Sequence, residues 1–285
     1  MKQVFVILFI GIMQFMFSCN SGESSRPIKE RNIQVEKAAV INTEEDKHYT
    51  LDPDVLLKDF MTWYTYTYNN VKLSDDFIGL NTDSVVIEKG DFLHQLATGK
   101  FIAIKTMVQH QVPYYKLYKF NSPNADIKGT IKQMALTAIA YYEMEGKELP
   151  PFDFTDLNGR RYNKMSTKGK IIIVKCWFIH CVPCVKEFPE LNKLVGQYRD
   201  RSDMLFVSLA RDSKQDLIPF LRTKTFKYAV VPDKEKYMSE ELKITEYPTH
   251  ILVDKSGKIV KVVNTISELA PLIKKQIEKT STTNL

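Results

Sequence analysis

The chain has 285 residues, enough for two ordinary domains and a tether, and 44% of them are hydrophobic, so a packed core is expected. The formal net charge is +6 at pH 7, but the 40 Lys and Arg residues and the 34 Asp and Glu residues are interspersed along the sequence. This pattern indicates a solvated surface of mixed charge, and no nucleic-acid partner is expected.

The first 19 residues predict a signal peptide. Lys2 supplies a positive charge, and residues 4–17 form an apolar segment that is short for a bilayer span. The segment ends at residues 17–20, Phe-Ser-Cys-Asn, which resemble a bacterial lipoprotein cleavage box. That resemblance implies that Cys19 is lipidated and anchors the mature chain to a membrane, in the cell envelope facing the periplasm. The alternatives are an uncleaved anchor and ordinary secretion with a free Cys19.

Residues 20–47 are polar, charged and free of aromatic side chains. Such a segment buries too little apolar surface to fold alone. We therefore expect a flexible tether, whose coil would reach on the order of 30 Å.

Residues 48–146 predict a small α+β domain of unknown role. Aromatic residues alternate with threonine over residues 63–68, which is typical of a strand. This tyrosine-rich segment is either part of the core or a surface for a partner, and core pairing is the commoner use of such residues. The other predicted elements are strands over 100–108 and 114–120, a helix over 89–98 that ends at Gly99, and a helix over 127–145 that ends at Gly146.

Residues 147–285 predict an α/β domain. Strands and helices alternate after Pro150 and Pro151, as in a βαβ sheet. Residues 170–177 are apolar except for Lys170 at the start and Lys175, which suits a strand buried on both faces. The other predicted elements are helices over 182–199, 213–223 and 267–279, and strands over 204–209, 228–231, 249–253 and 258–263.

The sequence Cys181-Val182-Pro183-Cys184 lies where this buried strand gives way to a helix. A thiolate is the species that attacks disulfides, and the N-terminus of a helix favours it. We expect Cys181, with an accessible sulfur, to be the attacking thiol and the more buried Cys184 to resolve the mixed disulfide. The alternatives are a zinc half-site, for which no second cysteine pair has ligand spacing, and two structural thiols. Cys176 is expected to be a packed core thiol.

The segment from Trp177 to Glu190, WFIHCVPCVKEFPE, followed later by Tyr-Pro-Thr at residues 247–249, resembles the signature of TlpA-like and ResA-like thiol–disulfide oxidoreductases. The resemblance covers roughly residues 146–277. It implies an α/β thioredoxin-like fold, a central mixed sheet flanked by helices. It also implies an enzyme that acts on disulfides or dithiols of other proteins without a metal or organic cofactor. Reduction is the favoured direction, with a membrane redox partner as the electron donor.

The resemblance also implies roles for individual residues. Pro248 matches a cis-proline that faces the cysteine pair, so that backbone groups at Tyr247 and Thr249 are candidates for binding an extended substrate. Glu187 matches a glutamate that influences proton transfer at the redox pair, although an ordinary exposed helix carboxylate is the alternative. Trp177 matches an aromatic residue that shields the site and is a further candidate for substrate binding.

Three positions near the cysteines need separate interpretation. Pro189 matches a proline that kinks the helix. His180 replaces the usual Trp before the first cysteine; it either lowers the pKa of Cys181 or faces solvent, and it is a candidate for substrate binding. Lys175 replaces the buried aspartate of thioredoxins, and we expect its amine to reach an edge of the sheet.

Two other functions are compatible with the sequence. Cys181, Cys184 and His180 would suit copper in a metallochaperone, although the copper carriers of this superfamily typically space their cysteines further apart. The second is a scaffold lipoprotein whose thioredoxin-like domain is no longer catalytic.

Overall fold

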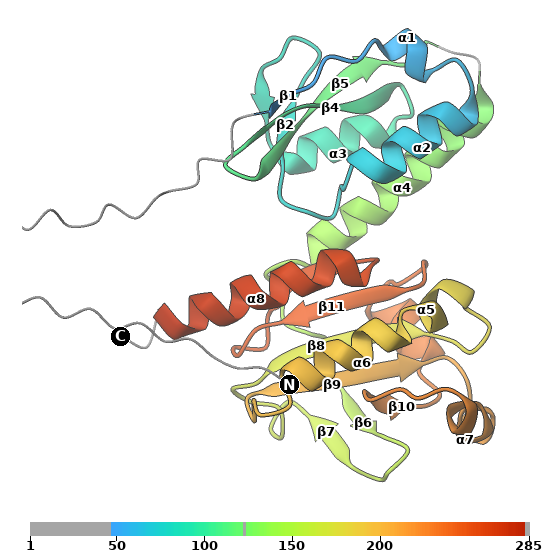
Figure 1. The fold of residues 1–285 in the computed structure, drawn as a ribbon, viewed down its shortest axis with the longest axis vertical. Coiled ribbons are helices and arrows are strands. Elements are labelled where there is room, and N and C mark those ends of the chain that lie inside the picture. The colour runs from blue at the N-terminus through green and yellow to red at the C-terminus, as the bar shows by residue number, and fades with distance from the viewer. Residues whose placement is uncertain (1–46, 122–123, 283–285) are drawn as a thin grey trace, which may run out of the picture. The chain divides into compact units, whose positions relative to one another are not determined.

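The strands within the described residues form two five-stranded sheets and one two-stranded sheet. Figure 1 shows the computed structural model. The structure describes residues 47–121 and 124–282. The predicted signal peptide, Cys19 and residues 20–46 of the predicted tether lie outside these residues. Within the described part of the chain, no helix combines the length and the apolar character that a bilayer span requires.

The first sheet has the strand order β1-β4-β5-β2-β3, with a long antiparallel hairpin of β4 and β5 at its centre. The strands and helices predicted over residues 89–98, 100–108, 114–120 and 127–145 are confirmed. The strands are β1 (Lys47–His48), β2 (Ile78–Leu80), β3 (Val86–Ile87), β4 (Phe101–Gln109) and β5 (Val112–Lys119). The helices are α1 (Pro53–Leu56), α2 (Phe60–Asn70), α3 (Lys89–Ala97) and α4 (Ala125–Met144).

The strand predicted over residues 63–68 is wrong, because this segment lies inside helix α2. Alternation with a period of two also places every fourth residue on one face of a helix, so the pattern fits both structures. Phe60, Tyr64 and Tyr68 have this spacing, and their rings stack in sequence with centroids 5.6 and 6.2 Å apart. The helix starts at Asp59, whose carboxylate accepts a hydrogen bond from the backbone N–H of Thr62.

Gly99, which follows α3, has a φ of +67°, a conformation that is unfavourable for residues with a Cβ atom. A Cβ atom there would also lie 2.9 Å from the side chain of Lys128. We expect Gly99→Ala to lower the free energy of unfolding by about 1 kcal/mol. Urea denaturation measures this change. Gly129→Ala is a matched control, because that position is exposed within α4 and its added Cβ meets nothing within 4 Å; it should raise stability by about 0.5–1 kcal/mol.

The second sheet has the order β10-β9-β8-β11-β12 and confirms the predicted mixed sheet. Strand β8 lies at its centre, parallel to β9 and antiparallel to β11. The strands are β8 (Ile171–Trp177), β9 (Met204–Ala210), β10 (Ala229–Val231), β11 (Thr249–Val253) and β12 (Ile259–Val263). The other elements are the small hairpin of β6 (Asp153–Thr155) and β7 (Arg161–Asn163), helices α7 (Lys214–Thr223) and α8 (Ile266–Thr282), and a π-helical turn (Tyr237–Glu241).

The single helix predicted over residues 182–199 is two helices, α5 (Val182–Lys186) and α6 (Phe188–Gln197). They meet at Glu187, and Pro189 lies in the first turn of α6. Proline lacks the N–H that a continuous helix requires, and its ring displaces the preceding turn. The predicted kink is therefore a break between two helices, and Glu187 is the residue at which they meet.

Alternate side chains of β8 face two different cores, because successive residues of a strand point to opposite sides of the sheet. Ile171 and Ile173 pack in one core with residues of α6 and α8. Val174 and Cys176 pack in the other core, which also contains Tyr141 from α4. Helix α4 thus links the two sheets, and the described residues belong to one compact unit.

Candidate active site

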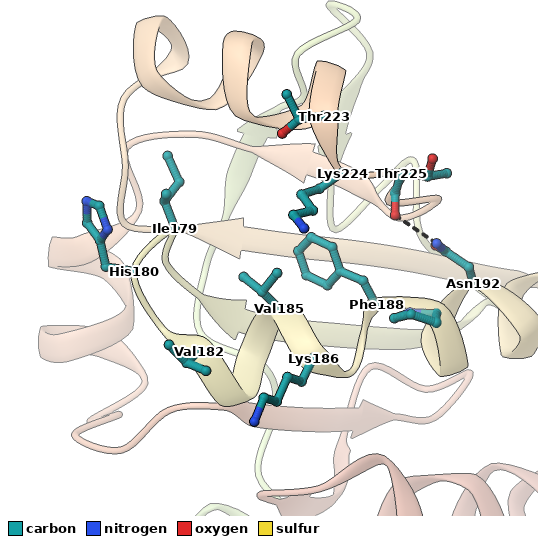
Figure 2. A pocket seen from close by; sticks show the side chains of 11 residues that line it. Ile179, His180, Val182, Val185, Lys186, Phe188, Asn192, Thr223, Lys224 and Thr225 are labelled. Carbon is teal, nitrogen blue, oxygen red and sulfur yellow. Dashed lines mark hydrogen bonds between the residues drawn. The ribbon is translucent and has the colours of Figure 1, made fainter.

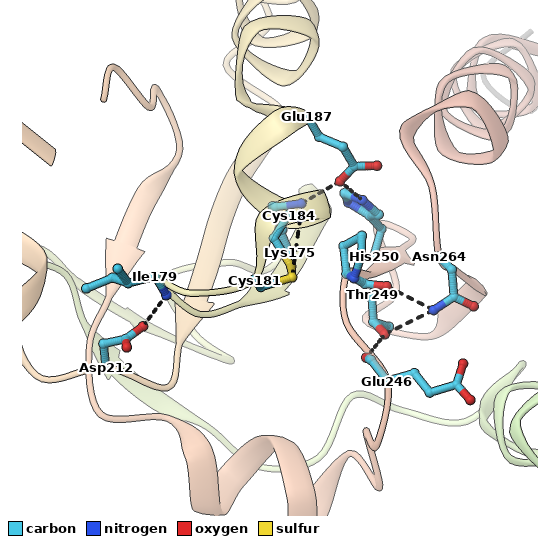
Figure 3. Close-up of a disulfide and its surroundings, with 11 residues drawn as sticks. Lys175, Ile179, Cys181, Cys184, Glu187, Asp212, Glu246, Thr249, His250 and Asn264 are labelled. Atoms are coloured by element: carbon cyan, nitrogen blue, oxygen red, sulfur yellow. Dashed lines mark hydrogen bonds and ion pairs between the residues drawn. A yellow bond between two sulfur atoms is a disulfide. The ribbon is translucent and has the colours of Figure 1, made fainter. Parts of the chain in front are cut away.

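Cys181 and Cys184 form a disulfide at the start of α5 (Figure 3). Cys181 is the N-cap residue of this helix, and its sulfur accepts a hydrogen bond from the backbone N–H of Cys184 at 3.3 Å. Cys181 is 5% exposed and Cys184 is fully buried. The order of exposure is as predicted, but Cys181 is less accessible than expected, since Phe178 and Tyr247 pack in the same cluster.

The loop before Cys181 is held by Asp212. One carboxylate oxygen of Asp212 accepts a hydrogen bond from the backbone N–H of Ile179 at 2.8 Å. Asp212 follows β9, which is the neighbour of β8 in the sheet. This contact fixes the strand-to-helix loop from the side of α7. It joins residues 33 positions apart, so no local sequence pattern indicates it.

A buried charged cluster lies beside the disulfide, at the break between α5 and α6 (Figure 3). Glu187 Oε2 is 2.6 Å from Lys175 Nζ and 3.0 Å from His250 Nε2. Its other oxygen, Oε1, accepts a hydrogen bond at 2.9 Å from the backbone N–H of Ile266, the first residue of α8. Lys175 and His250 are directly opposite each other on β8 and β11, and both are fully buried.

Two sequence-based expectations are therefore corrected. Lys175 does not reach an edge of the sheet, because β8 is the central strand and its ammonium group is paired internally with Glu187. The alternative that Glu187 is an ordinary exposed helix carboxylate is also wrong, since only 13% of its side chain is exposed. His250 was missed, because only the register of β11 against β8 shows that it meets the same carboxylate.

The cluster favours an ionised Glu187. Burial raises the pKa of this carboxyl, but the hydrogen bond from His250 and the charge of Lys175 outweigh it, and the pKa is lowered to about 2. Burial lowers the pKa of Lys175 and also that of His250, on which the nearby Lys175 charge acts in the same direction. A neutral His250 must carry its proton on Nε2 in order to donate to Glu187. Its Nδ1 then has no proton to donate and is a buried acceptor for which the described residues provide no donor.

The peptide bond between Tyr247 and Pro248 is cis, as predicted. Tyr247 is partly exposed, and its ring meets that of Phe178 edge to face at 5.4 Å. Thr249 is fully buried; its backbone pairs with Cys176 of β8 and its hydroxyl donates to the carbonyl of Glu246 at 2.7 Å. Thr249 thus supports this loop from within, in contrast to the predicted contact with substrate.

Comparison with known proteins agrees with this geometry. Residues 146–262 match the model of the AhpC/TSA family. The thiol–disulfide oxidoreductase ResA of Bacillus cereus is 30% identical over 118 residues, which span 41% of this chain and 68% of ResA. The chain belongs to the ResA family of thiol–disulfide oxidoreductases. ResA of Bacillus subtilis is 29% identical over 119 residues, 42% of this chain and 66% of that protein.

Among solved structures, the thioredoxin domain of a thiol–disulfide oxidoreductase from Bacteroides vulgatus is 27% identical, with a TM-score of 0.42. The match covers 46% of this chain and 96% of that domain. A solution structure of a protein disulfide isomerase homologue from Bacteroides thetaiotaomicron is 23% identical, with a TM-score of 0.42, over 46% of this chain and 86% of that one. The family match over residues 146–262 includes none of the elements from β1 to α4.

The remaining predicted site residues of this ResA-family protein differ in exposure. Trp177 is fully buried and packs edge to face on Phe188 with ring centroids 5.1 Å apart, so it supports the cysteine pair from beneath and presents no surface to a substrate. His180 is exposed. It lies at one end of a cavity of about 670 Å³ in which the side chains of Val185, Phe188 and Lys224 converge (Figure 2).

Among the described residues, no group of three or more His, Cys, Asp or Glu side chains is arranged to hold a metal ion. Cys176 is a free, fully buried thiol, and burial raises its pKa to about 12. It lies on the face of β8 opposite to Lys175. The prediction of a packed core thiol at this position is confirmed.

Proposed function

We propose that the chain acts outside the cytoplasm as a reductant of disulfides in other proteins, through Cys181 and Cys184. The observation that carries this proposal is the disulfide between these residues at the start of α5, in which Cys181 is the more exposed residue and against whose cluster Tyr247 packs. A helix N-terminus favours the thiolate form of the residue that caps it. Cys181 is therefore the attacking group when the pair is reduced.

The exchange proceeds in two steps that balance. The thiolate of Cys181 attacks one sulfur of a client disulfide, a mixed disulfide forms, and the other client sulfur leaves as a thiolate that takes up a proton. Cys184 then loses its proton and attacks Sγ of Cys181, which releases the second client cysteine and leaves the Cys181–Cys184 disulfide. Two electrons have passed to the client. A dithiol donor in the membrane would reverse these steps on the enzyme and restore the reduced pair.

The cysteine pair carries both the electrons and the covalent intermediate, so the proposed reaction requires no metal or organic cofactor. Lipidation of Cys19 would hold the enzyme at the membrane, near such a donor. The cavity beside α5 supports binding of a client segment, because Val182 is 62% exposed at its rim and its walls include Phe188 and Lys224. Pro248 and the backbone of Tyr247 would contact the client on the other side of the disulfide.

The test is to trap the intermediate with Cys184→Ser, which can form the mixed disulfide but cannot resolve it. We expect this variant, reduced and then mixed with oxidised envelope proteins, to form adducts that dithiothreitol releases. Non-reducing electrophoresis and mass spectrometry detect them. Because the variant is reduced and the clients are oxidised, such adducts support reduction as the direction.

The matched control is Cys181→Ser/Cys184→Ser, which keeps the buried Cys176 as its only thiol within the described residues and should form no adduct. The absence of adducts between reduced Cys184→Ser and oxidised clients would contradict the proposed function.

A further inference from the structure

Tyr141 belongs to α4 and lies outside the matched residues 146–262, yet its side chain is buried in the core of the second sheet. It is 3% exposed. Its hydroxyl oxygen is 3.0 Å from Thr249 Oγ1 and 3.0 Å from Asn264 Nδ2. Helix α4 therefore reaches the loop that contains the cis-proline.

The protons of this hydrogen-bond chain can be assigned from its acceptors. The hydroxyl of Thr249 has one proton, which it donates to the carbonyl of Glu246 at 2.7 Å. The hydroxyl of Tyr141 must therefore donate to Thr249. Asn264 has two protons on Nδ2 and donates one to the carbonyl of Pro248 at 2.9 Å and one to the oxygen of Tyr141. Figure 3 shows the part of this chain formed by Glu246, Thr249 and Asn264.

A second residue of α4 contacts the same loop. Thr137, one helical turn before Tyr141, donates a hydrogen bond from Oγ1 to the carboxylate of Glu246 at 2.8 Å. The end of α4 is fixed by Lys261 of β12. The Lys261 ammonium group is 2.6 Å from the carboxylate of Glu145, which follows α4, and 2.8 Å from that of Asp76, between α2 and β2. Helix α4 thus holds both ends of the loop of residues 246–249, through Thr137 at Glu246 and Tyr141 at Thr249, and its own end is fixed separately by Lys261.

The held loop is adjacent to the disulfide. Tyr247 packs in the cluster that contains Cys181 and Cys184, and its ring contacts Phe178 of the loop before Cys181. A client that presents a disulfide to Cys181 must pass over this loop. If this loop were mobile in the free protein, it would have to become ordered when the client binds. The entropic cost of that ordering would weaken client binding.

We propose that Tyr141 is a positioning residue, through which α4 holds the loop of residues 246–249 in the conformation that binds the client. This inference rests on the proposed function. It assigns to α4, which lies before the matched residues 146–262, the task of pre-organising the client site. Burial raises the pKa of Tyr141 to about 12, so its hydroxyl keeps the required proton throughout the working range of pH.

Tyr141→Phe removes the hydroxyl alone and is compared with Tyr142→Phe, which removes the hydroxyl of the neighbouring, exposed residue. Hydrogen–deuterium exchange is measured first. We expect the amides of Glu246, Tyr247 and Thr249 to exchange faster in Tyr141→Phe, and at the rate of the unaltered protein in Tyr142→Phe. Unchanged exchange in Tyr141→Phe would overturn the inference, whatever the activity of the protein.

Kinetics then separate positioning from a general structural role. With insulin as the disulfide substrate and dithiothreitol as the donor, we expect Tyr141→Phe to raise KM roughly three- to tenfold, the effect of one hydrogen bond on an equilibrium, with kcat unchanged. The rate with 5,5′-dithiobis(2-nitrobenzoic acid), which is too small to use the loop, should stay the same. Equal losses with both substrates, or an unchanged KM for insulin, would overturn the inference.

Thr137→Val provides a second test if Tyr141→Phe does not fold. It removes the bond to Glu246 and should raise KM for insulin in the same way by a smaller factor. Failure of the unaltered enzyme to reduce insulin would count against the proposed function, whereas the exchange rates of the loop still decide whether α4 holds it.

Discussion

Replacement of Cys181 by serine is expected to lower the rate of insulin reduction at least about a thousandfold, because loss of the attacking group removes the covalent pathway. A serine hydroxyl in this position is not ionised at neutral pH and cannot form a disulfide. Its size is close to that of cysteine, so the packing with Phe178 and Tyr247 should persist. Turnover of insulin with dithiothreitol, corrected for the uncatalysed rate, measures the effect.

The control for this prediction is Cys176→Ser. Cys176 lies on the opposite face of β8, is fully buried and has a pKa raised to about 12, so it is neither accessible nor ionised at neutral pH. This variant should keep its turnover number, although burial of a hydroxyl in an apolar core lowers stability. Substantial activity in Cys181→Ser, or loss of activity in a folded Cys176→Ser, would show that the wrong thiol has been assigned.

The residues that could be assigned from the sequence are those whose environment is local. The apolar run that forms β8 and the following Cys-x-x-Cys place a cysteine pair at a strand-to-helix junction without knowledge of any distant contact. Pro189 likewise acts on the turn that precedes it, and the break at Glu187 follows directly.

The residues that were misjudged depend on distant partners. The sequence shows Lys175 in an apolar strand but not its partner Glu187, which lies at the junction of α5 and α6. His250 joins them only through the register of β11 against β8. The contact of Tyr141 with Thr249 spans 108 residues of chain. The fold of residues 60–70 was missed for a different reason, since a short alternating pattern fits a helix face as well as a strand.

Glu187→Gln is expected to lower the free energy of unfolding at pH 7 by about 3–5 kcal/mol, because it leaves the buried ammonium group of Lys175 without a counter-charge. The amide cannot replace the carboxylate. Three donors occupy the two oxygens of Glu187: the ammonium group of Lys175, the Nε2–H of His250 and the backbone N–H of Ile266. An amide has one oxygen, so one donor would face an NH₂ group. Urea denaturation of the oxidised protein measures the loss.

The loss should depend on pH in a defined way. The pKa of Glu187 is about 2 in the folded protein against an ordinary value of 4.5. Its ionised form therefore contributes fully to stability above about pH 4.5, and the contribution is lost as the pH falls toward 2. The difference between these pKa values corresponds to roughly 3 kcal/mol. His250 adds to the acid sensitivity of the folded state. Because its pKa is lower in the folded protein than the ordinary value of 6.5, this histidine takes up a proton first in the unfolded chain as the pH falls below about 6.5.

The stability difference between the unaltered protein and Glu187→Gln should consequently shrink between pH 4.5 and 2. The double variant Lys175→Met/Glu187→Gln tests whether the unpaired charge of Lys175 causes the loss of stability, because it removes this buried charge together with its partner. Apolar replacement of a buried ion pair is commonly neutral or stabilising, so the double variant should regain most of the stability that Glu187→Gln loses. If the two changes were instead additive, the charge of Lys175 would not be the cause of the loss, and the role assigned to Glu187 would reduce to its hydrogen bonds with His250 and α8.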